Sequence, residues 1–152
     1  MQLFSPAFKD GEPIPWSASA PNENELPPLE IRDVPAQARS LAILLEDLDS
    51  PLGPVTHWLV WNLPVTTAHL DAVTLPEEGQ VGMDAFGKVG YLGPAPPEGS
   101  HHYRFRVLAL DTELELVTGA TRSQFDEAAQ GHVLEIADLT GVMERPPPEP
   151  ED

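Results

Sequence analysis

The chain has 152 residues, 25 of them acidic and 8 basic, which gives a formal net charge of −17 at pH 7. A chain of this length can bury the core of one domain without external staples. Its negative field repels nucleic-acid phosphates and anionic membrane surfaces, so we expect neither a nucleic-acid partner nor stable membrane association. The absence of cysteine excludes disulfides and thiol chemistry.

The two ends of the chain carry further signals. The N-terminus lacks the basic segment and long apolar region of a secretory signal, and no apolar run approaches bilayer length. These features predict a cytoplasmic protein. The acidic, proline-rich segment 146–152 cannot form a strand or a helix interior, and we expect it to be a disordered tail after a single domain, 1–145.

Short strands dominate the first half of the chain. Prolines leave room for only small strand pieces, at about 3–8 and 29–33. Segment 40–47 is apolar on both phases and predicts a strand buried on two faces. Segment 57–63 predicts a second central strand, in which simple alternation places four side chains on one face: His57, Leu59, Trp61 and Leu63.

The second half adds a third central strand, 103–110, and one helix. If the strand extends back to His101, then His101 and Tyr103 point to the same face. Segment 113–118 is a candidate to pair beside it. Thr121 or Ser123 can cap the helix and Gly131 can end it, followed by a final strand, 132–138. This order predicts a mainly β fold, an antiparallel β-sandwich with one or two short helices.

Polar side chains gather around a proline- and glycine-rich segment, 90–100, which predicts a rigid loop. His101 and Tyr103 follow it. Asp47 ends one predicted strand and His57 opens the next, so these two side chains can meet at the same rim of a sheet and form a functional pair. A nearby Asp can fix the tautomer of an imidazole and leave its other nitrogen to donate to an anion. For Asp47 a local turn role explains the residue equally well, and for Asp49 it explains the residue better.

Three kinds of site compete for these residues. A metal site lacks any standard ligand spacing, although five side chains could contribute: Asp47, Asp49, His57, His101 and His102. A hydrolase lacks a G-x-S-x-G motif, and Ser100 would face away from His101. A small anion pocket needs only His donors, a Tyr hydroxyl and free backbone N–H groups near Gly93 and Gly99. Of the three kinds of site, the anion pocket requires the fewest specific residues.

Four segments, in order and spacing, together resemble the phosphatidylethanolamine-binding protein family in its bacterial Raf-kinase-inhibitor-like branch: 47–51, 57–64, 86–97 and 101–110. The resemblance implies an antiparallel Greek-key β-sandwich with a small pocket for phosphate-like anions or phosphorylated head groups. It places Asp47, His57, His101 and Tyr103 in that pocket, with the loop from Gly93 through Pro96 to Pro97 as a wall. It implies no catalysis and no cofactor, and it makes a homodimer a candidate assembly.

This sequence departs from the usual pattern of the family at four positions: Leu48, Ser50, Val55 and His102.

The leading hypothesis is a non-enzymatic ligand-binding protein whose affinity for anions strengthens as the pH falls toward the histidine range, roughly 6 to 7. One alternative is an interaction protein that inhibits a kinase or a protease. The other is a hydrolase that uses a pocket histidine as its base.

Overall fold

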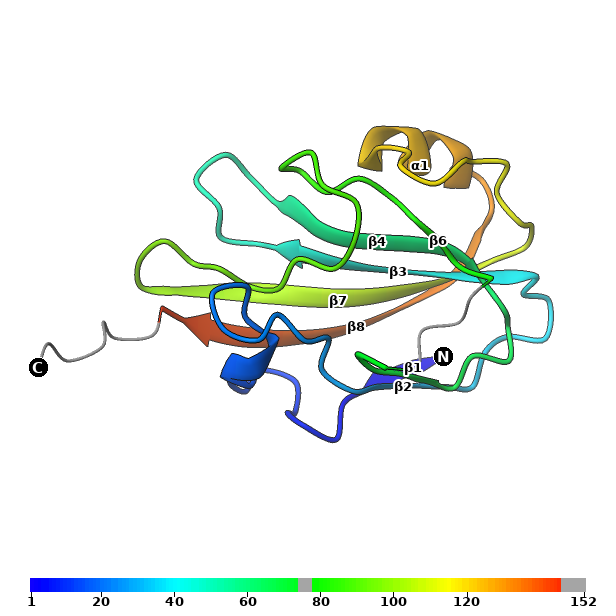
Figure 1. Ribbon diagram of the computed structural model, residues 1–152. Coiled ribbons are helices and arrows are strands. Elements are labelled where there is room, and N and C mark those ends of the chain that lie inside the picture. Colours follow the sequence, from blue (N-terminus) through cyan, green and yellow to red (C-terminus); the bar gives the residue numbers. More distant parts are fainter. Residues whose placement is uncertain (74–77, 146–152) are drawn as a thin grey trace, which may run out of the picture.

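A computed structural model describes residues 1–73 and 78–145, and these residues form two antiparallel sheets and one α-helix (Figure 1). The predicted mainly β sandwich with short helices is confirmed. The predicted tail, 146–152, lies outside the described residues. In chain order the elements are β1 (Gln2–Phe4), the 3₁₀ helix η1 (Trp16–Ala18), β2 (Leu29–Arg32), β3 (Ser40–Asp47), β4 (Val55–Leu63), β5 (His69–Leu70), β6 (Gln80–Val81), β7 (Ser100–Leu110), α1 (Arg122–Ala129) and β8 (Val133–Glu144).

Strand β3 lies at the centre of the larger sheet, whose order is β6-β4-β3-β7-β8. The smaller sheet has the order β1-β2-β5. Every residue of β3 is buried, because the smaller sheet covers one face of the larger one and α1 covers the other (Figure 1). A strand covered on both faces needs apolar side chains pointing in both directions, which is the pattern of this segment. The strand predicted at 40–47 is confirmed with the same bounds.

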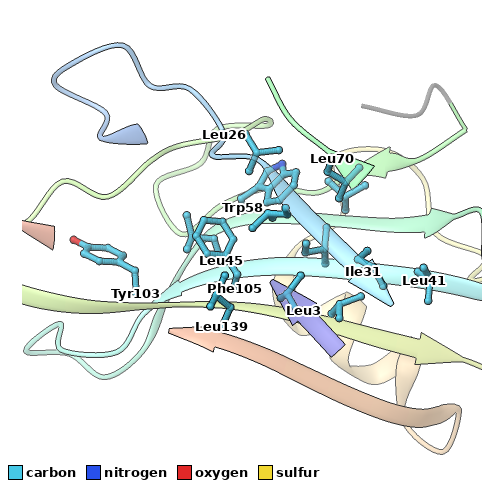
Figure 2. Packing of buried hydrophobic residues seen from close by; sticks show 14 of the residues in the cluster. Leu3, Leu26, Ile31, Leu41, Leu45, Trp58, Leu70, Tyr103, Phe105 and Leu139 are labelled. Atoms are coloured by element: carbon cyan, nitrogen blue, oxygen red, sulfur yellow. The ribbon is translucent and has the colours of Figure 1, made fainter. Parts of the chain in front are cut away.

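Two apolar clusters hold these three layers together. Leu45, Trp58 and Phe105 belong to the cluster between the sheets, which Figure 2 shows. Trp61 and Phe125 belong to the cluster between the larger sheet and α1. Each side chain of this size that is fully buried contributes roughly 2–3 kcal/mol to stability. No helix in the described part of the chain has the length and apolar character needed to cross a membrane.

Strand β4 contains two irregularities that change which way its side chains face. Relative to β3, strand β4 has one extra residue between Thr56 and Trp58 and another between Val60 and Leu63. Asn62, in the second irregularity, has a φ of 57°. In a β-bulge two residues oppose one on the partner strand, so the alternation of side chains is interrupted. The prediction that residues 57, 59, 61 and 63 share one face is therefore wrong: Leu59 and Trp61 face α1, whereas Leu63 packs between the sheets.

The predicted strand at 113–118 is also wrong, because that segment has no strand partner. The side chain of Asn62 binds the backbone of this segment at Leu114 instead. Asn62 Oδ1 accepts from the backbone N–H of Leu114 at 2.7 Å, and Asn62 Nδ2 donates to the Leu114 carbonyl at 2.9 Å. One side-chain amide thus satisfies backbone groups that a neighbouring strand would otherwise bind.

Strand β8 runs six residues past the predicted end at 138. Glycine usually weakens a strand, but Gly141 lies within β8 and allows close packing. A Cβ at Gly141 would lie 2.4 Å from Ile14 and 2.8 Å from Phe8, so only glycine leaves room for these side chains. The helix prediction is confirmed: Thr121 caps α1 in a capping box with Gln124.

Candidate functional site

A cavity of about 500 Å³ lies where β3 ends and where β4 and β7 begin. Three polar side chains from these strand ends line it: Asp47, His57 and His101. Ser50 adds a hydroxyl, and the remaining wall is mainly apolar, made by Pro51, Leu52, Val55, Phe86, Leu92 and Pro97. A larger cavity of about 620 Å³, beside β1 and β8, contains no histidine. We place the site in the smaller cavity because two histidines and an aspartate converge there.

Asp47 and His101 form a buried pair in this cavity. His101 Nδ1 donates to Asp47 Oδ2 at 2.7 Å, and the two side chains are only 12% and 7% exposed. The backbone N–H of Asp49 donates to the other oxygen, Asp47 Oδ1, at 2.9 Å. The predicted meeting of an aspartate and a histidine at one rim therefore takes place between β3 and β7, and the partner of Asp47 is His101 rather than His57.

His57 is the extra residue of the first bulge in β4, and its ring is held by backbone carbonyls. His57 Nδ1 donates to the carbonyl oxygens of Leu92 and Gly93, both at 3.1 Å. Carbonyl oxygens can only accept, so Nδ1 carries the hydrogen and Nε2 is left as the second ring nitrogen. The ring is almost fully buried and packs edge-on against Phe86 and Tyr103, with ring centres 5.5 Å apart in each pair.

Tyr103 lies behind the cavity and does not line it. It is completely buried, and its hydroxyl accepts a hydrogen bond from the backbone N–H of Ala95 at 3.3 Å. Burial raises the pKa of Tyr103, and the nearby Asp47 carboxylate raises it further, so the hydroxyl stays neutral. Its ring lies at the end of the inter-sheet cluster with the hydroxyl pointing away from the other labelled side chains (Figure 2). Tyr103 therefore links the apolar core to the polar site.

Gly93 and Pro96 support the wall from behind. Neither lines the cavity, whereas Ala95 and Pro97 do. A Cβ at Gly93 would lie 1.8 Å from the carbonyl oxygen of Ala18, so glycine is required for this close approach. The prediction of a free N–H at Gly93 is wrong, because that group donates to Asn24 Oδ1 at 2.7 Å.

Asp49 and His102 form a second pair on the outer surface. Both the backbone N–H and Nδ1 of His102 donate to Asp49 Oδ2 at 2.7 Å. The backbone hydrogen bond is the main reason that the pKa of Asp49 lies below its usual range. Both side chains are exposed, and neither lines the cavity. The structure thus separates the neighbours His101 and His102 onto opposite sides of β7.

Two further residues position the site, and sequence reasoning missed them. Asn24 holds the wall through Gly93 and through the Tyr91 carbonyl, to which its Nδ2 donates at 3.0 Å. Asp84 Oδ1 accepts from the backbone N–H groups of Phe86 and Lys88, which fixes the loop that carries the Phe86 ring. Asn24 is nearly seventy residues away from its partners in sequence, and no motif marks it. Over residues 1–73 and 78–145, no group of three or more His, Asp or Glu side chains is arranged to hold a metal ion.

Comparison with known proteins agrees with this architecture. A family model described as phosphatidylethanolamine-binding protein matches residues 4–144. The chain belongs to the phosphatidylethanolamine-binding protein family. A UPF0098 protein of Methanothermobacter thermautotrophicus is 41% identical over 95% of this chain and 99% of its own length. One of Pyrococcus abyssi is 38% identical over 95% of this chain and 86% of its own length.

Two crystal structures of members of the phosphatidylethanolamine-binding protein family share the fold. CT736 from Chlamydia trachomatis, described as a homolog of phosphatidylethanolamine-binding protein, has 37% identity and a TM-score of 0.90, over 95% of this chain and 97% of that one. YbcL from E. coli has 28% identity and a TM-score of 0.88, over 95% and 98% of the two chains. The resemblance predicted from four short segments is confirmed along nearly the whole chain.

Proposed function

We propose that this member of the phosphatidylethanolamine-binding protein family is a non-enzymatic ligand-binding protein that works without a cofactor. Its cavity takes small phosphate-like anions or phosphorylated head groups. The observation that carries the proposal is the orientation of the two cavity histidines. Protein acceptors hold Nδ1 of both rings, and no protein partner engages either Nε2 in the described part of the chain, so both Nε2 atoms are available to a ligand.

The charge state of these rings decides what they can bind. A protonated imidazole donates from both nitrogens, whereas a neutral ring with its hydrogen on Nδ1 presents an acceptor at Nε2. An anion therefore binds preferentially to the protonated form, and its binding increases the fraction of imidazole that is protonated. Because the chain carries a net charge of −17, binding should be weak, and it should tighten as the pH falls.

The test is a titration with inorganic phosphate at pH 6 and pH 7.5, followed by the ¹⁵N signals of the histidine side chains. We expect shifts in His57 and His101, and tighter binding at the lower pH. His57→Gln and His101→Gln should each weaken binding at least about tenfold, since each removes one charged donor. His132→Gln is the control, because the His132 side chain is exposed, pairs with Asp111 and does not line the cavity. Unchanged signals from His57 and His101 would reject the proposal.

A second candidate function is a regulatory interaction with a kinase or a protease. The observation that favours it is the apolar mouth of the cavity, where the side chain of Leu52 is 95% exposed and that of Phe86 is 58% exposed. A partner that covers this mouth would sense whether the cavity is occupied. Recovery of one specific protein from cytoplasmic lysate by the wild type but not by His57→Ala would support this candidate. Cell fractionation tests the proposed cytoplasmic location, and sedimentation tests the proposed homodimer.

A further inference from the structure

The donors that face the cavity are few, and none carries a permanent charge. Neither lysine nor arginine lines it. The backbone N–H groups of four lining residues are already bound within the protein: those of Ala85, Phe86, Leu92 and Ala95. The side-chain donors that remain for a ligand are the two imidazoles and the hydroxyl of Ser50. Any positive charge that meets an anion therefore comes from His57 and His101.

The negative groups around these imidazoles limit that charge. Asp47 lines the cavity itself and contacts His101. With both rings protonated, the two imidazoles and Asp47 sum to a single positive charge. The other titratable groups on the elements packed against the rings do not line the cavity: Glu46, Asp49, Asp84, Lys88, Tyr91, Glu98, His102, Tyr103, Arg104 and Arg106. Asp49 and His102 hydrogen-bond to each other on the outer surface.

We propose that the cavity selects singly charged organic anions that carry an apolar group, and discriminates against doubly charged phosphate monoesters. The inference rests on the proposed function and specifies its ligand class. A second negative charge would find no cation to pair with and would face Asp47 in a site largely removed from water. A carboxylate and a phosphodiester share the favoured chemistry, because each has one negative charge at neutral pH.

The apolar wall supplies the other half of the specificity. Pro51, Leu52, Val55, Phe86, Leu92 and Pro97 surround the polar end. A volume of about 500 Å³ is within the usual range for small-molecule sites. Inorganic phosphate would leave most of this surface in contact with water. A ligand with a short alkyl or aryl group beside its anionic head would cover it, gaining affinity from each buried methylene.

Three ligands with unbranched alkyl chains of five or six carbons test the inference: hexanoate, methyl hexyl phosphate as the diester, and hexyl phosphate as the monoester. A phosphate monoester has its second pKa near 6, so at pH 7.5 only about 3% of it is singly charged. If the site binds that form alone, hexyl phosphate should bind roughly 30-fold more weakly than the diester at pH 7.5. At pH 5.5 about three quarters of it is singly charged, so the difference should shrink to less than twofold.

Calorimetry at both pH values separates the possible results. Tighter binding of hexanoate than of the diester identifies a carboxylate as the preferred source of the single charge, and the reverse order identifies a phosphodiester. Equal or tighter binding of the monoester at pH 7.5 would overturn the inference while the proposed anion site stands. Binding of none of the three ligands, together with no response to inorganic phosphate, would overturn both.

Leu52→Lys provides an independent check. The side chain lines the mouth of the cavity and is 95% exposed, so a lysine there adds a cation without disturbing the core. This variant should improve the binding of hexyl phosphate at least about threefold more than that of hexanoate, because a dianion gains more from an added charge. Val73→Lys is the matched control, since Val73 is equally exposed and lies outside the cavity. Equal improvement of both ligands by Leu52→Lys, or the same selective effect from Val73→Lys, would count against the inference.

Discussion

Replacing Gly93 with alanine should destabilise the fold and weaken the site together. The new Cβ would lie 1.8 Å from the carbonyl oxygen of Ala18, so one of the two segments must retreat by at least about 1 Å. Three hydrogen bonds converge on this contact. Tyr91 donates to the Ala18 carbonyl, the Gly93 N–H donates to Asn24, and the Gly93 carbonyl accepts from His57. Loss of two or three of them at about 1 kcal/mol each predicts a destabilisation of about 2–3 kcal/mol.

Urea unfolding followed by tryptophan fluorescence measures this effect, since Trp58 and Trp61 are fully buried. Gly131→Ala is the matched control. Gly131 has a φ of 82° but nothing within 4 Å of its added Cβ, so its replacement should cost only about 1–2 kcal/mol of backbone strain. Gly93→Ala should also weaken phosphate binding, because one acceptor that orients His57 moves. A Gly93→Ala protein no less stable than Gly131→Ala, with unchanged phosphate affinity, would refute this reasoning.

Three further substitutions test the framework around the site. Glu46→Ala should cost about 2 kcal/mol in urea unfolding, because this buried carboxylate lies between two arginines. The exposed Asp126→Ala should cost only a few tenths of a kcal/mol, and equal losses would contradict the assignment. Asn62→Ala should cost about 2–3 kcal/mol, and Asn62→Gly about 1 kcal/mol less, since glycine accepts the positive φ but loses the same hydrogen bonds. The depressed pKa of Asp49 means that its stabilising effect is present above its unfolded pKa of about 3.9 and is lost as the pH falls through the folded value. Asp49→Asn should therefore lower stability slightly at pH 6, by a few tenths of a kcal/mol for an exposed group, and the difference should vanish at the lowest pH at which the protein remains folded.

Local sequence patterns predicted the central strands because burial on two faces leaves a clear apolar signature. Strand β3 has that signature along its whole length, and the capping box of α1 is equally local. The errors arose where distant contacts override local preference. Gly141 continues a strand because the side chains of Ile14 and Phe8 need its space, and segment 113–118 does without a partner strand because Asn62 binds its backbone. Neither contact leaves a trace in the neighbouring sequence.

The candidate site was predictable in its residue types but not in its pairings. Three of the six predicted residues line the cavity, namely Asp47, His57 and His101. Their partners depend on strand register, and a single bulge is enough to change it. Gly93, Pro96 and Tyr103 lie behind the wall, because the close approach of the Ala18 carbonyl and the depth of the Tyr103 ring are tertiary features.

The bulge at His57 explains how this acidic chain presents two imidazoles to the proposed anion site. In a regular strand His57 would alternate with Leu59 and Trp61 and face α1, away from the carbonyls of Leu92 and Gly93. The cavity would then contain Asp47 and one imidazole, whose charges cancel when the ring is protonated. The extra residue in β4 turns a second imidazole into the cavity. A net positive charge for an anion becomes available only with that second ring, and it is a single charge because Asp47 is retained to hold His101.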